Sequence, residues 1–194
     1  PISGRVLAIK STHLISGKEG DAIIIESDGK EGNNHFENKD VENLTKEQLI
    51  EKIKSAGIVG MGGAMFPTHV KLNTKDKKVD SVILNGCECE PYITADDWAM
   101  REYSNEIVEG LKIILKITGA KKGYIAIEDN KPDSIKAMNK ASKNEKDICV
   151  KSIKTIYPQG AEKTLIHTIL GKTVPCGRLP LDVGVIVQNV ATAK

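Results

Sequence analysis

The sequence GIVGMGGAMFPTHVKL spans residues 57–72 and holds four glycines within seven positions, followed by Pro67, Thr68 and Lys71. Glycine has no Cβ, so its backbone adopts positive φ readily and exposes bare N–H groups to a ligand. A helix that begins near Thr68 would add unpaired N–H donors and the positive end of its dipole, which favour a bound phosphate. We therefore predict that this segment, with Lys71 as a cation, faces a phosphate-bearing ligand.

A second interpretation of the glycine-rich segment stays open. The segment is not a P-loop, because Lys71 comes too late and no Ser or Thr follows it. It is not a clean dinucleotide-binding fingerprint either, because residues 45–56 before it have a helical pattern instead of a strand pattern. A glycine-rich crossover between two helices, with no ligand, explains the same residues.

The composition indicates one sizeable globular domain, with room for a small appendage. The chain has 194 residues, of which 40% are hydrophobic and 28% charged, and its net charge is +2. This balance and an aromatic content of 4% give no reason to expect nucleic acid as a partner. No apolar run approaches the roughly 20 residues of a transmembrane span.

The cysteines and the first residue bear on the setting of the protein. Four cysteines without a dense framework favour a reducing compartment, and hence the cytoplasm. The chain begins with Pro1 and shows no signal peptide. We expect it to be a fragment of a longer protein.

Apolar patterns along the chain predict an α/β fold. Strand patterns occur at residues 81–85, 123–128, 148–153 and 183–187. Helical patterns occur at residues 45–56, 98–118, 132–142 and 161–170. The first helix has a clear start, because Thr45 is a suitable N-cap and Gln48 completes a capping box. The alternation predicts a Rossmann-like, mainly parallel sheet with flanking helices.

The first 31 residues form a separate piece in this prediction. Short β-branched runs at residues 4–9 and 22–26, with a turn at 16–21 between them, predict a β-hairpin. The polar stretch after the hairpin has no period, so we assign residues 32–40 to a linker and residues 41–194 to the main domain.

Acidic residues crowd into the segment that follows strand 81–85. In open α/β sheets ligands bind outside the carboxyl ends of the strands. Ionised carboxylates there could accept hydrogen bonds from the hydroxyls of a ribose or ribityl chain. The alternative is a solvated acidic loop that leads to a helix N-terminus, where Asp96 and Asp97 act as cap or first-turn residues and not as catalytic acids.

Cys87 and Cys89 lie two positions apart in the same segment. In an extended chain their Cα atoms would be about 6.6 Å apart, at the upper edge of disulfide geometry. Their spacing and the scattered histidines do not match a zinc site, so we predict no metal ligands. Redox-active thiols and ordinary packed cysteines both remain open.

Two later strand ends also carry polar residues. After strand 148–153, the sequence YPQGAEKTLI repeats the pattern of a glycine before a helix, and Glu162 falls in the first turn, where it would favour the helix dipole. Asn189 and Thr192 follow the last strand and could contact a ligand or form a turn.

Five stretches taken together resemble one family. In chain order they are GIVGMGGAMFPTHVKL, NGCECEPYIT, YPQGAEKTLI, VPCGRLP and VIVQNVAT. They resemble the RnfC family, the C subunits of Rnf electron-transport complexes, which is similar to the flavin-bearing, NADH-oxidising subunit of respiratory complex I. The resemblance covers about residues 42–194, and the hairpin looks like the family's N-terminal barrel-sandwich segment.

The resemblance implies FMN held non-covalently in the Rossmann-like domain, where it exchanges a hydride with NADH or NAD⁺. It implies other subunits of the complex as partners, and a position on the cytoplasmic face of the membrane. The cofactor does the chemistry, so no catalytic side chain is expected. The implied cofactor-binding residues are Gly60, Gly62, Gly63, Lys71, Asn85, Glu88, Glu90, Tyr157, Gly160, Glu162 and Asn189.

Several departures from the family pattern suggest different functions. Met65 stands where a small residue is usual, and Cys87 and Cys176 replace other residues. These thiols resemble those of RnfC-like proteins associated with clostridial proline reductase, which implies electron delivery to a soluble reductase. A docking scaffold with a vestigial flavin pocket and a thiol-redox module are two further hypotheses. The sequence has no C-x₂-C-x₂-C run, so [4Fe–4S] clusters are expected only in a downstream segment.

Overall fold

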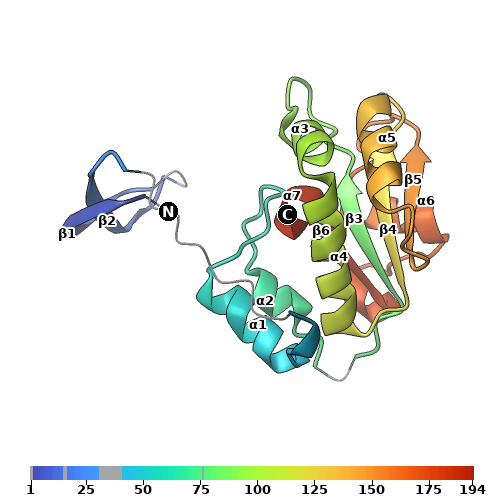
Figure 1. The fold of residues 1–194 in the computed structure, drawn as a ribbon, viewed down its shortest axis with the longest axis horizontal. Coiled ribbons are helices and arrows are strands. Elements are labelled where there is room, and N and C mark those ends of the chain that lie inside the picture. The colour runs from blue at the N-terminus through green and yellow to red at the C-terminus, as the bar shows by residue number, and fades with distance from the viewer. Residues whose placement is uncertain (1, 15–16, 31–40, 76) are drawn as a thin grey trace. The chain divides into compact units, whose positions relative to one another are not determined.

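The computed structural model describes residues 2–14, 17–30, 41–75 and 77–194, and it divides into two compact units, residues 1–39 and 40–194. The smaller unit is an antiparallel hairpin of β1 (Gly4–His13) and β2 (Glu19–Ser27), as predicted (Figure 1). The strands are longer than predicted. Residues 19–21, which the sequence placed in the turn, pair within the ladder, because β1 continues far enough to bond with them.

The larger unit is built on a parallel four-stranded sheet, which confirms the predicted fold class. Its strands are β3 (Ser81–Gly86), β4 (Lys122–Glu128), β5 (Ile148–Ile153) and β6 (Val185–Asn189). They lie in the order β5-β4-β3-β6. The chain therefore proceeds from β3 toward β5 on one side and returns to place β6 on the other side of β3 (Figure 1). This reversal is a topological switch point, where ligands of open α/β sheets usually bind.

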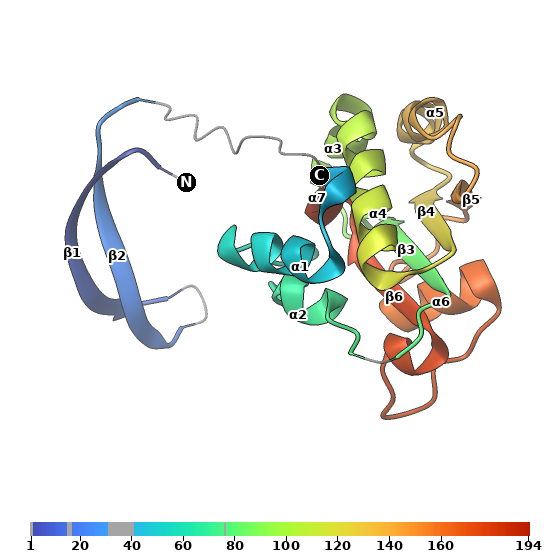
Figure 2. The same cartoon turned by 60° about the horizontal axis from the view of Figure 1, so that its bottom comes forward.

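The helices include the four that the apolar patterns predict, with one of these divided in two, and the short helix expected near Thr68; α7 was not predicted. They are α1 (Lys46–Ser55), α2 (Thr68–Leu72), α3 (Ala95–Glu102), α4 (Ser104–Thr118), α5 (Pro132–Ala141), α6 (Glu162–Leu170) and α7 (Val190–Ala193). The predicted capping box of α1 is confirmed, because Thr45 and Gln48 bond reciprocally. Figure 2 shows α1 and α2 side by side. In the part of the chain that the structure describes, no helix is long and apolar enough to cross a bilayer.

Two element boundaries were predicted wrongly. The helix predicted at residues 98–118 is two helices, because Tyr103 leaves the helical region with φ −122° and ψ 34°. The last strand begins at Val185, two residues later than predicted. Residues 180–183 form a short 3₁₀ helix that Gly184 ends in a left-handed conformation.

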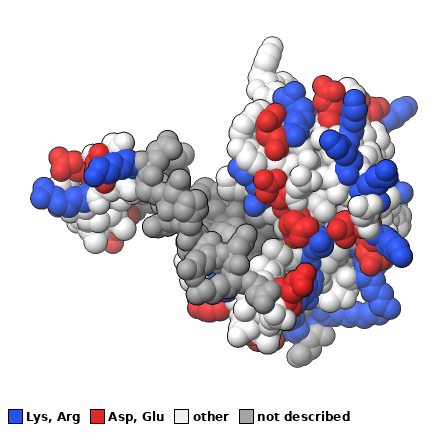
Figure 3. Space-filling view, viewed as in Figure 1, with Lys and Arg blue, Asp and Glu red and all other residues white. Residues whose placement is uncertain are grey.

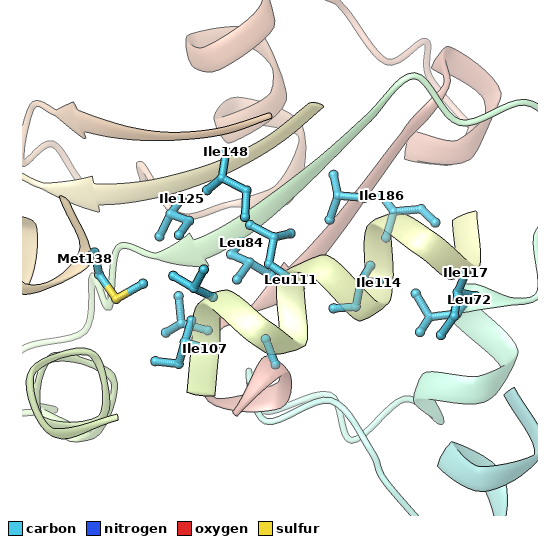
Figure 4. Packing of buried hydrophobic residues seen from close by; sticks show 14 of the residues in the cluster. Leu72, Leu84, Ile107, Leu111, Ile114, Ile117, Ile125, Met138, Ile148 and Ile186 are labelled. Carbon is cyan, nitrogen blue, oxygen red and sulfur yellow. The ribbon is translucent and has the colours of Figure 1, made fainter. Parts of the chain in front are cut away.

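Buried apolar residues cover both faces of the sheet. Alternation along β3 directs Leu84 to one face and Ile83 to the other. Figure 4 shows α4 packing on the first face through Ile107, Leu111 and neighbouring residues. On the second face α6 contributes Leu165 and Ile166.

Positive and negative side chains are interspersed on the face of the larger unit that Figure 3 shows.

Candidate functional site

Two adjoining clefts lie at the carboxyl ends of β3 and β6, at the topological switch point. The larger cleft has a volume of about 530 Å³ and the smaller about 320 Å³. Four residues line both clefts, namely Gly62, Asn85, Gly160 and Asn189. A further hollow of about 480 Å³ lies beside the edge strand β5, but no predicted site residue lines it.

The structure brings together ten of the eleven predicted cofactor-binding residues. Besides the four shared residues, Gly63, Glu88 and Glu90 line the larger cleft. Gly60, Lys71 and Glu162 line the smaller one. Tyr157 is the exception, because its side chain is exposed and lines neither cleft.

The glycine-rich segment folds back on itself and is anchored from both sides. The Gly60 amide donates to the Phe66 carbonyl at 2.8 Å, and Val59 and Pro67 form an antiparallel bridge. The Met61 amide donates to Thr192 Oγ1 at 2.9 Å, so the Thr192 hydroxyl anchors this loop. Gly63 has φ 96°, a conformation that favours glycine.

The helix after this segment offers less to a phosphate than predicted. Helix α2 has only five residues, so its dipole is small, and the Thr68 amide already donates to the Ile58 carbonyl. The cation of the cleft is also engaged, because Lys71 Nζ lies 3.1 Å from Glu162 Oε1. A phosphate at Lys71 would therefore compete with the Glu162 carboxylate.

Asn85 joins the end of β3 to the loop before α6. Its Nδ2 donates to the Gly160 carbonyl at 2.8 Å, and its Oδ1 accepts from the Cys87 amide at 3.1 Å. A Cβ added at Gly160 would lie 3.0 Å from both Cys87 Cβ and Cys89 Sγ. Glycine at position 160 thus allows the two loops to approach closely and to form a common floor of both clefts.

Glu88 caps helix α3 from the preceding loop. Its carboxylate accepts from the Asp96 amide at 2.6 Å and from the Asp97 amide at 3.1 Å. Thr94, which precedes the helix, makes no side-chain cap, so Glu88 supplies the missing acceptor. Asp96 and Asp97 occupy the first turn of α3, as predicted.

Asp96 was missed as a member of the site. It lines the larger cleft, and its Oδ2 accepts from Asn189 Nδ2 at 2.6 Å. The pKa of the Asp96 carboxyl is raised to about 6, chiefly by burial and also by the Glu88 carboxylate, against the lowering effect of the Asn189 hydrogen bond. One feature of the sequence indicated a site role for Asp96, namely its position directly after the strand-end loop. A role at the N-terminus of the following helix explained this residue equally well.

The thiols of Cys87 and Cys89 are packed in surroundings that favour the protonated form. Cys87 is fully buried, and burial raises its pKa to about 12. Cys89 Sγ donates to the buried Glu128 Oε1 at 3.2 Å and accepts from the Gly160 amide at 3.0 Å. Burial also raises the pKa of Cys89. Because thiol redox chemistry needs a thiolate, these environments disfavour it.

We expect two classes of thiol in this protein. Cys149 and Cys176 are exposed, whereas Cys87 is inaccessible. A maleimide or disulfide reagent at pH 7 should therefore modify Cys149 and Cys176 within minutes and Cys87 only after denaturant is added. Mass spectrometry of the modified peptides measures the order. Fast labelling of Cys87 in the folded chain would contradict the burial described above.

The clefts fit a mononucleotide. Both volumes lie within the range of small-molecule sites, and glycine backbone forms part of the walls. Amide groups of Asn85 and Asn189 and the carboxylates can bond to hydroxyls, and Lys71 can bond to a phosphate. Met65 is 69% exposed and lines neither cleft, so this bulkier residue does not block them. The fold and the site together define a nucleotide-binding domain of the parallel α/β class.

Comparison with known proteins assigns the family. The Nuo51 FMN-binding domain matches residues 53–194, and the chain belongs to this family. The predicted resemblance is confirmed as well. The chain is 47% identical to the C subunit of the Na(+)-translocating ferredoxin:NAD(+) oxidoreductase complex of Acetobacterium woodii, with 99% of this chain and 44% of that protein covered. It is 51% identical to the C subunit of the proton-translocating ferredoxin:NAD(+) oxidoreductase complex of Clostridium ljungdahlii, with 88% and 38% covered.

The chain spans less than half of the length of these relatives. Among solved structures, the crystal structure of NAD+-reducing [NiFe]-hydrogenase in the air-oxidized state has a similar fold, with a TM-score of 0.66. The sequences are 23% identical, and the match covers 76% of this chain and 29% of the other. This likeness concerns the fold.

Proposed function

We propose that this chain is the FMN-binding, NAD(H)-reactive portion of an electron-transfer subunit of the ferredoxin:NAD oxidoreductase type. One observation carries the proposal, namely that the predicted cofactor-binding residues of an FMN-binding family gather around two adjoining clefts at the switch point of the sheet. The FMN, when bound, supplies the redox chemistry by accepting a hydride from NADH and releasing electrons singly.

The side chains of the clefts would bind and orient the cofactor. The backbone at Gly62 and Gly63 leaves room for a close approach, and Asn85 and Asn189 offer amide groups held in place by hydrogen bonds. Lys71 would bind the phosphate after exchanging its contact with Glu162. Carboxylates at Glu88 and Glu90 would accept hydrogen bonds from sugar hydroxyls. No cleft residue needs to act as an acid or base for hydride transfer.

The partners follow from the same proposal. The relatives are named as subunits of multi-subunit complexes, so other subunits of such a complex are the expected neighbours. [4Fe–4S] clusters, expected only on a downstream segment, would supply one-electron chemistry, and the subunit would lie on the cytoplasmic face of the membrane. The alternative hypothesis, electron delivery to a soluble reductase, is not supported by Cys87, because that thiol is buried.

Flavin titration tests the proposal. The chain should quench FMN fluorescence with saturable binding, and the full-length protein should contain FMN that NADH bleaches. Because Lys71 offers a charged donor to phosphate, Lys71→Gln should weaken FMN binding by about ten-fold. The same variant should bind riboflavin, which lacks the phosphate, as the parent does. Absence of saturable binding for both flavins would overturn the proposal and favour the docking scaffold.

A further inference from the structure

Asp96 is a cleft carboxylate to which the family resemblance gave no role. It is half-buried in the first turn of α3 and lines the larger cleft together with Glu88 and Glu90. Its backbone amide is bonded to Glu88, but its carboxylate is directed to Asn189, at 2.6 Å. The Asp96 carboxylate therefore does not cap α3, and it contacts Asn189, a predicted ligand-binding side chain, directly.

The contact fixes the orientation of the Asn189 amide. Asn189 Oδ1 accepts from the Ala191 amide at 2.8 Å and so caps α7. Its Nδ2 is left as the donor, and Asp96 Oδ2 receives one of its hydrogens. Asn189 lines both clefts, so Asp96 positions a side chain that the two clefts share. Truncation of Asp96 would release the amide from one of its two anchors.

The charge of Asp96 also acts on any anion in the clefts. Glu88, Glu90 and Asp96 line the larger cleft, and the one cation among the described lining residues is Lys71, which is paired with Glu162. A phosphate monoester carries about −1.5 to −2 charges near neutral pH, so each ionised carboxylate repels it. Burial is the main reason that the pKa of the Asp96 carboxyl is raised to about 6, so this carboxyl changes its charge just below neutral pH.

The surroundings of Asp96 account for this titration. The Glu88 carboxylate raises the pKa of Asp96, while the Lys131 ammonium and the Asn189 amide lower it. On its own helix, Asp97 is paired with Arg101 at 3.3 Å. Helix α3 packs against β3, α4, α5 and α7. Of these, β3 and α7 contain no ionisable side chain, whereas α4 and α5 carry both signs of charge, and none of their charged residues shifts the pKa of Asp96; they are Glu106, Glu109, Lys112 and Lys116 on α4 and Asp133, Lys136 and Lys140 on α5.

We propose that Asp96 is a positioning residue for Asn189 and a proton-controlled charge in the cleft, so that the clefts bind an anionic mononucleotide more tightly when this carboxyl is neutral. The affinity part of this inference rests on the proposed FMN site. The link between Asp96 and Asn189 does not, because it exists without any ligand.

The link is tested first, without flavin. In the NMR spectrum of the protein, the side-chain amide of Asn189 should shift with pH, with a midpoint near 6. The shift should vanish in Asp96→Asn, which keeps an acceptor oxygen but does not titrate. An Asn189 amide that shows no titration in the parent would overturn the inference, whether or not flavin binds.

The charge is tested by titrating FMN and riboflavin into the parent, Asp96→Asn and Asp96→Ala at pH 5 and pH 7.5. At pH 7.5 Asp96→Asn should bind FMN about three-fold to ten-fold more tightly than the parent, and at pH 5 equally. Comparing variants with the same ligand cancels the titration of the FMN phosphate itself. Riboflavin affinity should differ less than two-fold between the parent and Asp96→Asn. Asp96→Ala should bind both flavins more weakly than Asp96→Asn does, because both variants lack the charge but only in Asp96→Ala does Asn189 lose its partner.

The outcomes separate this inference from the proposed function. Equal FMN affinity of parent and Asp96→Asn at both pH values would overturn the charge role. A riboflavin affinity that rises as much as the FMN affinity from the parent to Asp96→Asn at pH 7.5 would do the same. If neither flavin binds the parent at either pH, the proposed function and the affinity part fail together, and the NMR titration still decides whether Asp96 positions Asn189.

Discussion

Gly110→Ala should destabilise the larger unit by about 3 kcal/mol, an effect at the upper end of the range for overpacking. Gly110 lies in α4, where it faces the end of α7. A Cβ at this position would overlap the Ala193 carbonyl oxygen and lie 2.6 Å from the Ala193 carbonyl carbon. These are backbone atoms that cannot rotate away, so one of the two helices must move.

Close packing and helix propensity predict opposite changes in the stability of Gly110→Ala, so the measured sign distinguishes them. Alanine is a better helix former than glycine by about 1 kcal/mol, so helix propensity alone would make the variant more stable. Denaturant unfolding of the variant and of Glu109→Ala, an exposed neighbour on α4, measures the difference. The control should change stability by less than about 0.5 kcal/mol. A stabilised Gly110→Ala would mean that α4 and α7 do not pack closely.

The consequence extends to the clefts, because Asn189 caps α7 and Thr192 lies within it. Thr192 holds the glycine-rich loop through the Met61 amide, and Asn189 is bonded to Asp96. Displacing α7 in Gly110→Ala should therefore also weaken FMN binding, although Gly110 lines neither cleft.

Gly62→Leu should lower FMN affinity by about 100-fold or more, corresponding to about 2.7 kcal/mol. Gly62 lines both clefts, and a Cβ there would make only an ordinary contact, 3.5 Å from Asn189 Cβ. The backbone at Gly62 does not require positive φ. The leucine can therefore be accommodated by the fold, and its outer atoms would occupy the space intended for the cofactor.

Two measurements separate blocking of the cleft from damage to the fold. The melting temperature of Gly62→Leu should stay within about 2 °C of the parent, which corresponds to a stability change of at most about 1 kcal/mol. Met65→Leu is the matched control, because this neighbouring side chain is exposed and lines neither cleft. It should bind FMN as the parent does. Unchanged FMN affinity in Gly62→Leu would place the cofactor elsewhere.

Local patterns predicted most elements but missed the break at Tyr103. The capping box of α1 and the strands β3, β4 and β5 are encoded in a few adjacent residues, and the structure confirms them. The buried stripe of α4 begins only at Ile107, so the apolar period is unaffected by the interruption before it. The Tyr103 ring meets Trp98 and the ammonium of Lys194, a residue far away in the sequence.

In the candidate site, too, the sequence indicated individual residues, but only the tertiary structure shows which side chains they contact. Motifs indicated Lys71, Asn85 and Asn189 as members of one site, and the structure places them around adjoining clefts. The partners of these side chains could not be predicted. Lys71 meets Glu162, and Asn189 meets Asp96, only because β6 lies next to β3 and α6 covers one end of the clefts. Whether these residues contact FMN stays a prediction.

The order of amino acids alone determined the parallel α/β class, the family and most of the residues that gather at the switch point, because periodicity, caps and motifs act over short stretches of chain. The tertiary structure decided which carboxylates cap a helix, which ones line a cleft and which cation is already paired. Those properties depend on burial and on distances of about 3 Å between groups far apart in the sequence, which no local pattern encodes.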